Sequence, residues 1–158
     1  RTLLEHALAA VADAVEVVVV GAEVPPTRPA TFVREDPPHG GPAAGLLAGR
    51  DALQGMPDHL AVLAVDMPRV GADTFRRLRA AADSRDGAFL ADPSGRRQLA
   101  GVLKLAALDR VRPDDPFGFP LHRLLAPLDL AAVAAQSGEA RDIDTWADLR
   151  DLGDGADA

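Results

Sequence analysis

A continuous apolar run, residues 60–65 with the sequence Leu-Ala-Val-Leu-Ala-Val, is followed directly by Asp66, Met67 and Pro68. Such a run is typical of a strand that is covered on both faces, as in a parallel sheet between two layers of helices. The residue that follows this strand lies at the carboxyl edge of the sheet, where open α/β folds bind ligands. Asp66 is therefore a candidate ligand for a hard cation such as Mg²⁺. It is equally a candidate turn residue that accepts backbone hydrogen bonds.

The segments around this run alternate between helical and extended patterns, which predicts an α/β fold with a mainly parallel sheet. The turn sequence from Asp92 to Gly95 joins two of the strands as a hairpin and so adds one antiparallel strand. The predicted helices are residues 2–14, 42–53, 72–82, 105–108, 121–125 and 145–152. The predicted strands are residues 15–20, 31–34, 60–65, 88–91 and 98–103, with a last strand or pair of strands around Val133 and residues 140–143.

A chain of 158 residues is long enough for one domain. We expect residues 1–152 to form that domain and residues 153–158 to be a frayed tail. The 17 basic and 24 acidic residues give a formal net charge of −7, which disfavours a nucleic-acid partner. No apolar stretch is long enough to span a bilayer, so no membrane partner is expected. The absence of cysteine is compatible with a reducing cytoplasm, where we expect the protein, and a monomer is favoured.

A run of small residues, residues 40–45 with the sequence Gly-Gly-Pro-Ala-Ala-Gly, precedes and begins a predicted helix. Small residues let a ligand approach the backbone closely, and the start of a helix attracts anions. The run lacks the lysine followed by serine or threonine of a P-loop. Spacing alone therefore favours a glycine turn followed by a tightly packed helix.

Three further aspartates are candidates for binding. Asp142 and Asp144 flank Ile143 on a predicted strand and point the same way, so either could join Asp66 around one metal ion. Taken alone, they are better explained as favourable charges near the start of the last helix. Asp36 could accept hydrogen bonds from a purine or a ribose, but its place in a proline-rich loop favours a turn residue.

The motifs, taken in chain order, resemble the molybdenum cofactor guanylyltransferase family, within the nucleotidyltransferases of α/β type. The resemblance covers residues 1–152, and its specific part is the pairing of G-P-A-A-G-L with the later D-M-P. The motifs that carry it are V-V-V-V-G, V-R-E-D-P-P, G-G-P-A-A-G-L, L-A-V-D-M-P, R-R-Q-L-A-G-V and D-I-D-T-W-A-D-L.

The resemblance implies a three-layer, Rossmann-like nucleotidyltransferase fold and a Mg²⁺-dependent reaction. The terminal phosphate of molybdopterin, or of its molybdenum form, attacks the α-phosphate of GTP, and pyrophosphate leaves. The implied roles are Mg²⁺ and phosphate binding and catalysis for Asp66, a second metal ligand at Asp144, nucleotide contacts at Gly21, Asp36, Gly41 and Gly45, and acceptor contacts at Arg96, Arg97 and Gln98. With the motifs combined, a metal ligand is favoured over a turn residue for Asp66.

The family's strongest signature is an amino-terminal strand and glycine-rich loop that wraps the triphosphate, and Arg1 stands about where that segment would end. The strand would be central in the sheet, so we expect the full-length protein to carry it. Two other enzyme hypotheses are a relative that uses CTP and one with a sugar-phosphate acceptor. A non-catalytic, regulatory protein with the same nucleotide-binding fold is the alternative from another class.

Overall fold

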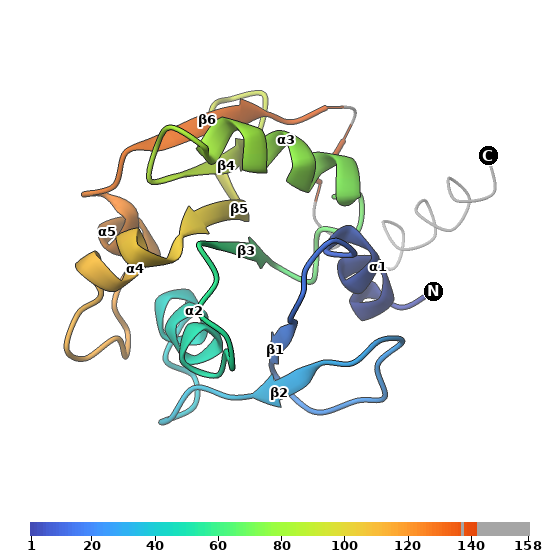
Figure 1. Ribbon diagram of the computed structural model, residues 1–158, viewed down its shortest axis with the longest axis vertical. Helices are drawn as coiled ribbons and strands as arrows, with labels where there is room; N and C mark the ends of the chain where they lie inside the picture. Colours follow the sequence, from blue (N-terminus) through green and yellow to red (C-terminus); the bar gives the residue numbers. More distant parts are fainter. Residues whose placement is uncertain (137, 142–158) are drawn as a thin grey trace.

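The strands lie in two sheets with helices on both faces (Figure 1). The structure, a computed structural model, describes residues 1–136 and 138–141. The helices of this part are α1 (Leu3–Ala10), α2 (Pro42–Asp51), α3 (Ala72–Ala82), α4 (Leu105–Val111) and α5 (Leu121–Leu125). The strands are β1 (Val18–Val20), β2 (Thr31–Val33), β3 (His59–Leu63), β4 (Gly87–Ala91), β5 (Arg97–Lys104) and β6 (Leu130–Ala134).

One sheet pairs β1 with β2 in parallel, and the other has the strand order β3-β5-β4-β6. Strand β5 is antiparallel to both of its neighbours, whereas β4 and β6 are parallel. The predicted hairpin between β4 and β5 is confirmed, and Gly95 in its turn has a φ of +86°, a conformation that favours glycine. The prediction of a mainly parallel arrangement with one antiparallel strand is thus confirmed.

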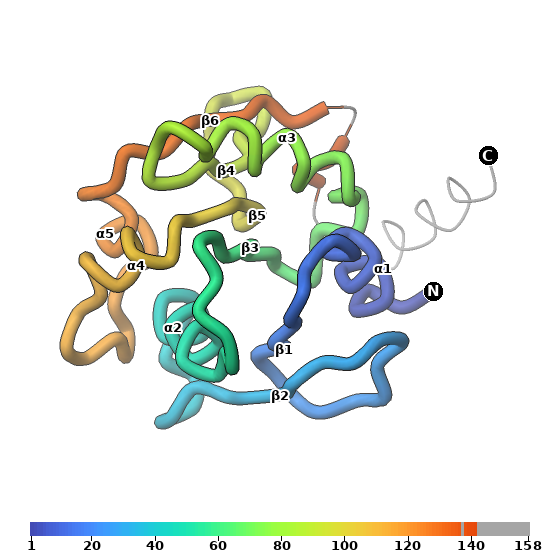
Figure 2. Tube along the Cα trace, viewed as in Figure 1, coloured from blue at the N-terminus to red at the C-terminus, as the bar shows by residue number. Residues whose placement is uncertain are grey.

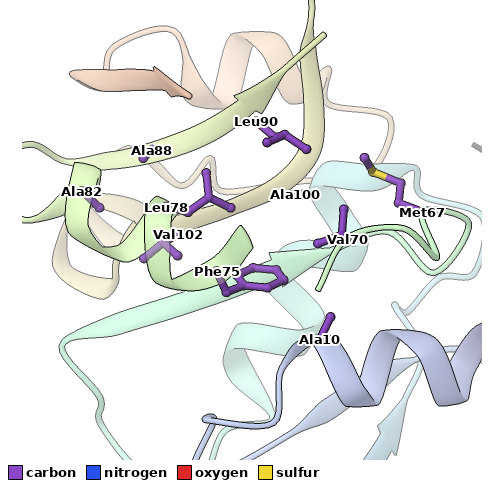
Figure 3. Packing of buried hydrophobic residues seen from close by; sticks show 10 residues of the cluster. All are labelled: Ala10, Met67, Val70, Phe75, Leu78, Ala82, Ala88, Leu90, Ala100 and Val102. Carbon is purple, nitrogen blue, oxygen red and sulfur yellow. The ribbon is translucent and has the colours of Figure 1, made fainter. Parts of the chain in front are cut away.

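Two apolar clusters cover opposite faces of the larger sheet, which gives the fold its three layers. Successive residues of β4 point to opposite sides, so that Ala88 and Leu90 join one cluster and Phe89 joins the other. The first cluster lies under α1 and α3, and Figure 3 shows Phe75, Leu78 and Ala82 of α3 packed in it. The second cluster gathers side chains of α2, α4 and α5. The helix predicted at residues 72–82 is therefore confirmed, and Phe75, Leu78 and Ala82 form its inward face.

Helix α2 covers both sheets. Leu47 of α2 lies in the second cluster, against which Leu60 and Val62 of β3 pack. On its other side, a Cβ built at Gly49 would lie 3.1 Å from Cγ2 of Val20 in β1. Since the same helix lies against β1 and β3, these strands are neighbours beneath it. Within the described residues neither has a paired strand on the edge that faces the other.

The amino ends of β1 and β3 lie together. The carboxylate of Glu16, just before β1, accepts hydrogen bonds from the backbone N–H groups of Gln54 and Gly55, at 2.7 and 3.1 Å. These two residues belong to the loop that leads from α2 into β3. The strands β1, β2 and β3 therefore run in the same direction, and their carboxyl ends share one edge.

Two of the predicted strands differ in the structure. The run at residues 60–65 is not buried on both faces, because β3 ends its sheet and pairs only with the antiparallel β5; Ala61 and Val65 are exposed. The strand predicted at residues 15–20 is observed only at Val18–Val20, and Val15 is fully exposed. Both errors have one cause, since β-branched and apolar content indicates extended structure but not how many neighbours a strand has.

The remaining corrections concern the two ends of the domain. Helix α1 ends at Ala10 rather than at residue 14, after beginning with a capping box between Thr2 and Glu5. The last described strand is Leu130–Ala134, and Ala140 lies in a turn rather than in a strand. The predicted strand residues 142–143, the helix at residues 145–152 and the tail lie outside the described residues. No helix in the described part of the chain is long and apolar enough to cross a membrane.

Candidate functional site

Asp66 follows β3 at the carboxyl edge of the sheet, as predicted. The strand's last pairing joins Leu63 to Ala100, and the N–H of Ala64 donates to the carbonyl of Leu99 at 2.8 Å. The chain then turns, with the N–H of Met67 donating to the carbonyl of Ala64 at 3.3 Å. The core holds the loop after Asp66, because both Met67 and Val70 are buried in the first cluster (Figure 3).

The carboxylate of Asp66 is free of protein donors in the part of the chain that the structure describes. A turn aspartate behaves differently, as Asp92 shows in the same protein. Its carboxylate accepts hydrogen bonds from the hydroxyl of Ser94 and from the N–H groups of Ser94 and Arg96, which lower the pKa of Asp92. The partly buried Asp66 thus lacks the contacts expected of a turn residue and keeps its oxygens available for a cation.

The other predicted contact residues lie at the ends of neighbouring strands. Gly21 directly follows β1 and donates its N–H to the carbonyl of Val33, the last residue of β2, at 2.8 Å. Asp36 lies in the loop after β2, is exposed, and has no hydrogen bond to its carboxylate among the described residues. Asp66 and Asp36 therefore both lie beyond the carboxyl ends of parallel strands, at one edge of the molecule.

Asp36 lines a cavity of about 200 Å³ between the loop after β2, helix α2 and residues 112–117. The ring of Phe117, which is 48% exposed, forms part of its wall. Gly40 fixes this loop, because its carbonyl accepts the N–H of Gly118 at 2.8 Å and a Cβ on it would lie 2.7 Å from that of Ala44. The spacing of residues 40–45 alone did not indicate this close contact.

The two glycines predicted to shape the nucleotide wall have different structural reasons. Gly41 precedes α2 with a φ of +92°, a conformation that other residues rarely adopt. Gly45 lies inside α2, where an added Cβ would meet Cγ1 of Val20 at an ordinary 3.8 Å. The tight contact of α2 with β1 is made instead by Gly49. Only Gly41 therefore requires glycine on conformational grounds.

Of the three residues predicted beside the acceptor, Arg96 directly precedes β5 and Arg97 and Gln98 begin it, and the antiparallel direction of β5 brings its start to the same edge. Arg97 pairs with Ala91, the last residue of β4, and its guanidinium lies 5.7 Å from the centre of the Phe89 ring. The side-chain amide of Gln98 donates to the carbonyl of Arg96 and to the carboxylate of Asp92, at 3.0 and 3.3 Å. The amide of Gln98 is thus already engaged, whereas the guanidinium groups of Arg96 and Arg97 form no ion pair with the described residues.

Most of the described arginines outside this edge form ion pairs, although Arg1, Arg28 and Arg123 do not. The ion pairs between described residues involve seven arginines, which lie on helices, at helix ends or in the turn before β4: Arg50, Arg76, Arg77, Arg79, Arg85, Arg110 and Arg112. At the carboxyl edge, by contrast, four arginines have no ion pair within the described residues: Arg34, Arg69, Arg96 and Arg97. Sequence reasoning missed Arg34 and Arg69, because pairing depends on contacts distant in the sequence.

The donor set at this edge fits a weakly held divalent cation. No group of three or more His, Asp or Glu side chains that could hold a metal ion occurs in the described residues. Mg²⁺ needs no such group, since it usually keeps several waters and binds through one or two carboxylates together with substrate phosphates. The free carboxylate of Asp66 would serve as that protein ligand. Asp144, predicted as a second one, lies outside the described residues.

Comparison with known proteins decides the family. The family model described as "MobA-like NTP transferase domain" matches residues 1–149, which is nearly the whole chain. The chain belongs to this family. The resemblance inferred from the motifs is thus confirmed, and the MobA-like chain is an enzyme of the nucleotidyltransferase type.

A curated relative agrees with this assignment. The MobA-like chain is 35% identical, over 161 aligned residues, to the molybdenum cofactor guanylyltransferase of Acidiphilium cryptum (strain JF-5). The alignment covers 94% of this chain and 79% of the relative.

Solved structures support the fold. A 2-C-methyl-D-erythritol 4-phosphate cytidylyltransferase from Thermus thermophilus matches with a TM-score of 0.73 and 21% identity, over 100% of this chain and 90% of that one. Molybdopterin-guanine dinucleotide biosynthesis protein A from Archaeoglobus fulgidus matches with a TM-score of 0.61 and 17% identity, over 80% of this chain and 68% of that one. The predicted Rossmann-like nucleotidyltransferase fold is confirmed.

Proposed function

We propose that the protein transfers GMP from GTP to molybdopterin, or to its molybdenum form, in the synthesis of the molybdenum cofactor. An oxygen of the acceptor's terminal phosphate forms a bond to the α-phosphorus of GTP. The bond between that phosphorus and the oxygen bridging to the β-phosphate breaks, and pyrophosphate leaves. The relative from Acidiphilium cryptum, named for guanylyl transfer, supports this choice of nucleotide and cofactor.

The observation that carries the proposal is the free carboxylate of Asp66 at the end of β3. Both reactants are anions, so the barrier is one of alignment and charge. A bound Mg²⁺ would stabilise negative charge on the transferred phosphate and orient the reacting groups. In the proposal Asp66 holds that ion together with the nucleotide phosphates, and Asp144 is its second protein ligand.

The neighbouring residues would orient the two substrates. Gly21, Gly41 and Gly45 would form the backbone wall beside the nucleotide, and Asp36 would accept hydrogen bonds from it. Arg96, Arg97 and Gln98 would lie beside the acceptor. The guanidinium groups of the two arginines form no ion pair with the described residues, so they are available to a phosphate.

The test measures pyrophosphate release with molybdopterin as acceptor, Mg²⁺ present, and GTP or CTP as donor. We expect release with GTP to exceed release with CTP. A preference for CTP would overturn the guanylyl assignment and favour the cytidylyl reaction, for which the structural match from Thermus thermophilus is named.

We also propose that the reaction takes place in the cytoplasm, with the protein as a monomer. The absence of cysteine is compatible with a reducing compartment. The mass measured by light scattering in solution tests the proposed monomer, and a stable dimer would contradict it.

A further inference from the structure

We infer that Arg69 is a phosphate-binding residue of this enzyme, a role that the sequence motifs do not give it. The inference rests on the proposed function in one respect, since the phosphate would belong to one of its substrates or to the released pyrophosphate. It starts from a single unusual atom. The Nε of Arg69 is buried and makes no hydrogen bond in the described part of the structure.

A rigid loop carries Arg69. Pro68 just before it is buried, as are Met67 and Val70 on either side, and the N–H of Val70 donates to the carbonyl of Met67 at 3.2 Å. Figure 2 shows the chain passing from the end of β3 through this loop to the start of α3. A residue held on both sides by buried neighbours keeps its side chain in a fixed place, which suits a binding group.

The side chain of Arg69 reaches across the carboxyl edge. Its Cδ lies 3.6 Å from the position of a Cβ built on Gly138, in the segment that follows β6. Strands β3 and β6 are the two outer strands of the larger sheet. The side chain therefore reaches from the loop after β3 to the segment after β6, at the edge where β4 ends and where Arg97, just after Arg96, begins β5.

The nearest buried acid already has another partner. Glu139, next to Gly138, accepts two hydrogen bonds from the guanidinium of Arg77, at 2.9 and 2.7 Å, and one from the N–H of Gln136 at 2.7 Å. It also accepts a hydrogen bond from the hydroxyl of Thr74. Because these contacts satisfy the carboxylate of Glu139, it does not require an ion pair with Arg69.

Asp66, three positions before Arg69, likewise forms no ion pair or hydrogen bond with it. Arg69 thus carries a positive charge and a buried donor with no partner in the described residues. Leaving a charged donor unpaired is costly, which indicates an anionic ligand. A phosphate group fits, because a guanidinium donates two parallel hydrogen bonds to it, and a cation held by Asp66 would bind the same group from its other side.

Isothermal titration of the full chain with inorganic pyrophosphate, and separately with inorganic phosphate, tests the inference. Arg69→Met keeps the apolar stem beside Gly138 and removes the donors. We expect it to weaken binding of at least one of the two anions by about tenfold or more, the range of a charge-assisted hydrogen bond. Weakening for pyrophosphate assigns Arg69 to the nucleotide side, and weakening for phosphate alone assigns it to the acceptor side.

Arg79→Met is the matched control, because it removes the same charge from an exposed pair with Asp83 on α3. Arg79→Met should change the affinity for pyrophosphate and the affinity for phosphate by less than about twofold each. If Arg69→Met does not fold, the same titrations are made with Arg69→Gln. Unchanged affinity in a folded Arg69 variant, or no binding of either anion by the unaltered protein, overturns the inference. Absence of guanylyl transfer with intact Arg69-dependent anion binding would instead refute the proposed function alone.

Discussion

At the scale of single residues, the free carboxylate of Asp66 predicts a loss of activity without a loss of stability. Asp66→Asn keeps the size of the side chain but removes its charge, so the metal ion and the phosphates should be held poorly. We expect kcat to fall by about 100-fold or more, the cost of removing one group that stabilises transition-state charge. The measurement is initial pyrophosphate release as a function of Mg²⁺ concentration, together with thermal unfolding.

Asp58→Asn is the control for Asp66, because Asp58 precedes β3 and so lies at the opposite end of the same strand. It is exposed, and no donor in the described residues contacts its carboxylate. Its activity should stay within about twofold of the parent, since surface substitutions of this kind have small effects. If Asp66→Asn behaves like Asp58→Asn, Asp66 is not a metal ligand.

Gly41 and Gly45, the two glycines of α2 and its start that we propose to line the nucleotide, predict opposite effects on stability. Gly41→Ala forces a side chain into a φ of +92°, which should lower the free energy of unfolding by about 1–3 kcal/mol. Gly45→Ala should raise it by about 0.5–1 kcal/mol, because alanine is the better helix former and its Cβ would have room beside Val20. Urea unfolding of both variants checks the pair, and equal effects would contradict the geometry of α2.

At the scale of elements, Glu139 predicts a pH-dependent link between α3 and the segment after β6. Burial raises the pKa of Glu139, but the hydrogen bonds from Arg77, Thr74 and Gln136 outweigh it and hold the pKa below its ordinary value. The side chains of Glu139 and Arg77 are only 11% and 28% exposed. Glu139→Gln should therefore cost about 2–3 kcal/mol of unfolding free energy at neutral pH, because it leaves Arg77 poorly paired.

The sign of the pH effect follows from the lowered pKa. The stability that Glu139 contributes is fully present above the unfolded-state pKa of about 4.3 and is lost as the pH falls through the lower folded-state value. The difference between the parent and Glu139→Gln should shrink accordingly in acid. Asp83→Asn, which breaks the exposed pair with Arg79, should cost less than about 0.5 kcal/mol at any pH. A difference that persists unchanged well below pH 4 would refute the role of the carboxylate.

A helix or strand could be predicted from the sequence where the local pattern of apolar residues also determines which side chains are buried. Helix α3 has the predicted bounds, because the spacing of Phe75, Leu78 and Ala82 defines the face that packs on the sheet. The run that became β1 carries an equally strong β-branched signal, yet Val15 is exposed. The candidate site follows the same rule. The sequence could propose Asp66, because it follows a predicted strand, but it could not propose Arg69, because no sequence pattern shows that an arginine has no partner.

At the scale of the whole molecule, the two sheets present facing edges beneath α2. Hydrogen bonds alternate along an antiparallel pair. Since Ala64 donates toward β5, Leu60 and Val62 do so as well, and the N–H groups of Ala61 and Leu63 point to the open edge. Within the described residues no strand accepts these donors, so the edge of β3 that faces β1 should be weakly protected.

Hydrogen exchange of residues 1–158 tests this open edge. The amides of Ala61 and Leu63 should exchange much faster than those of Leu60 and Val62, because their donors have no partner strand within the described residues. The amides of Phe89 and Val102, inside the larger sheet, should be protected and serve as the internal reference. Equal protection of all four amides of β3 would contradict the open edge.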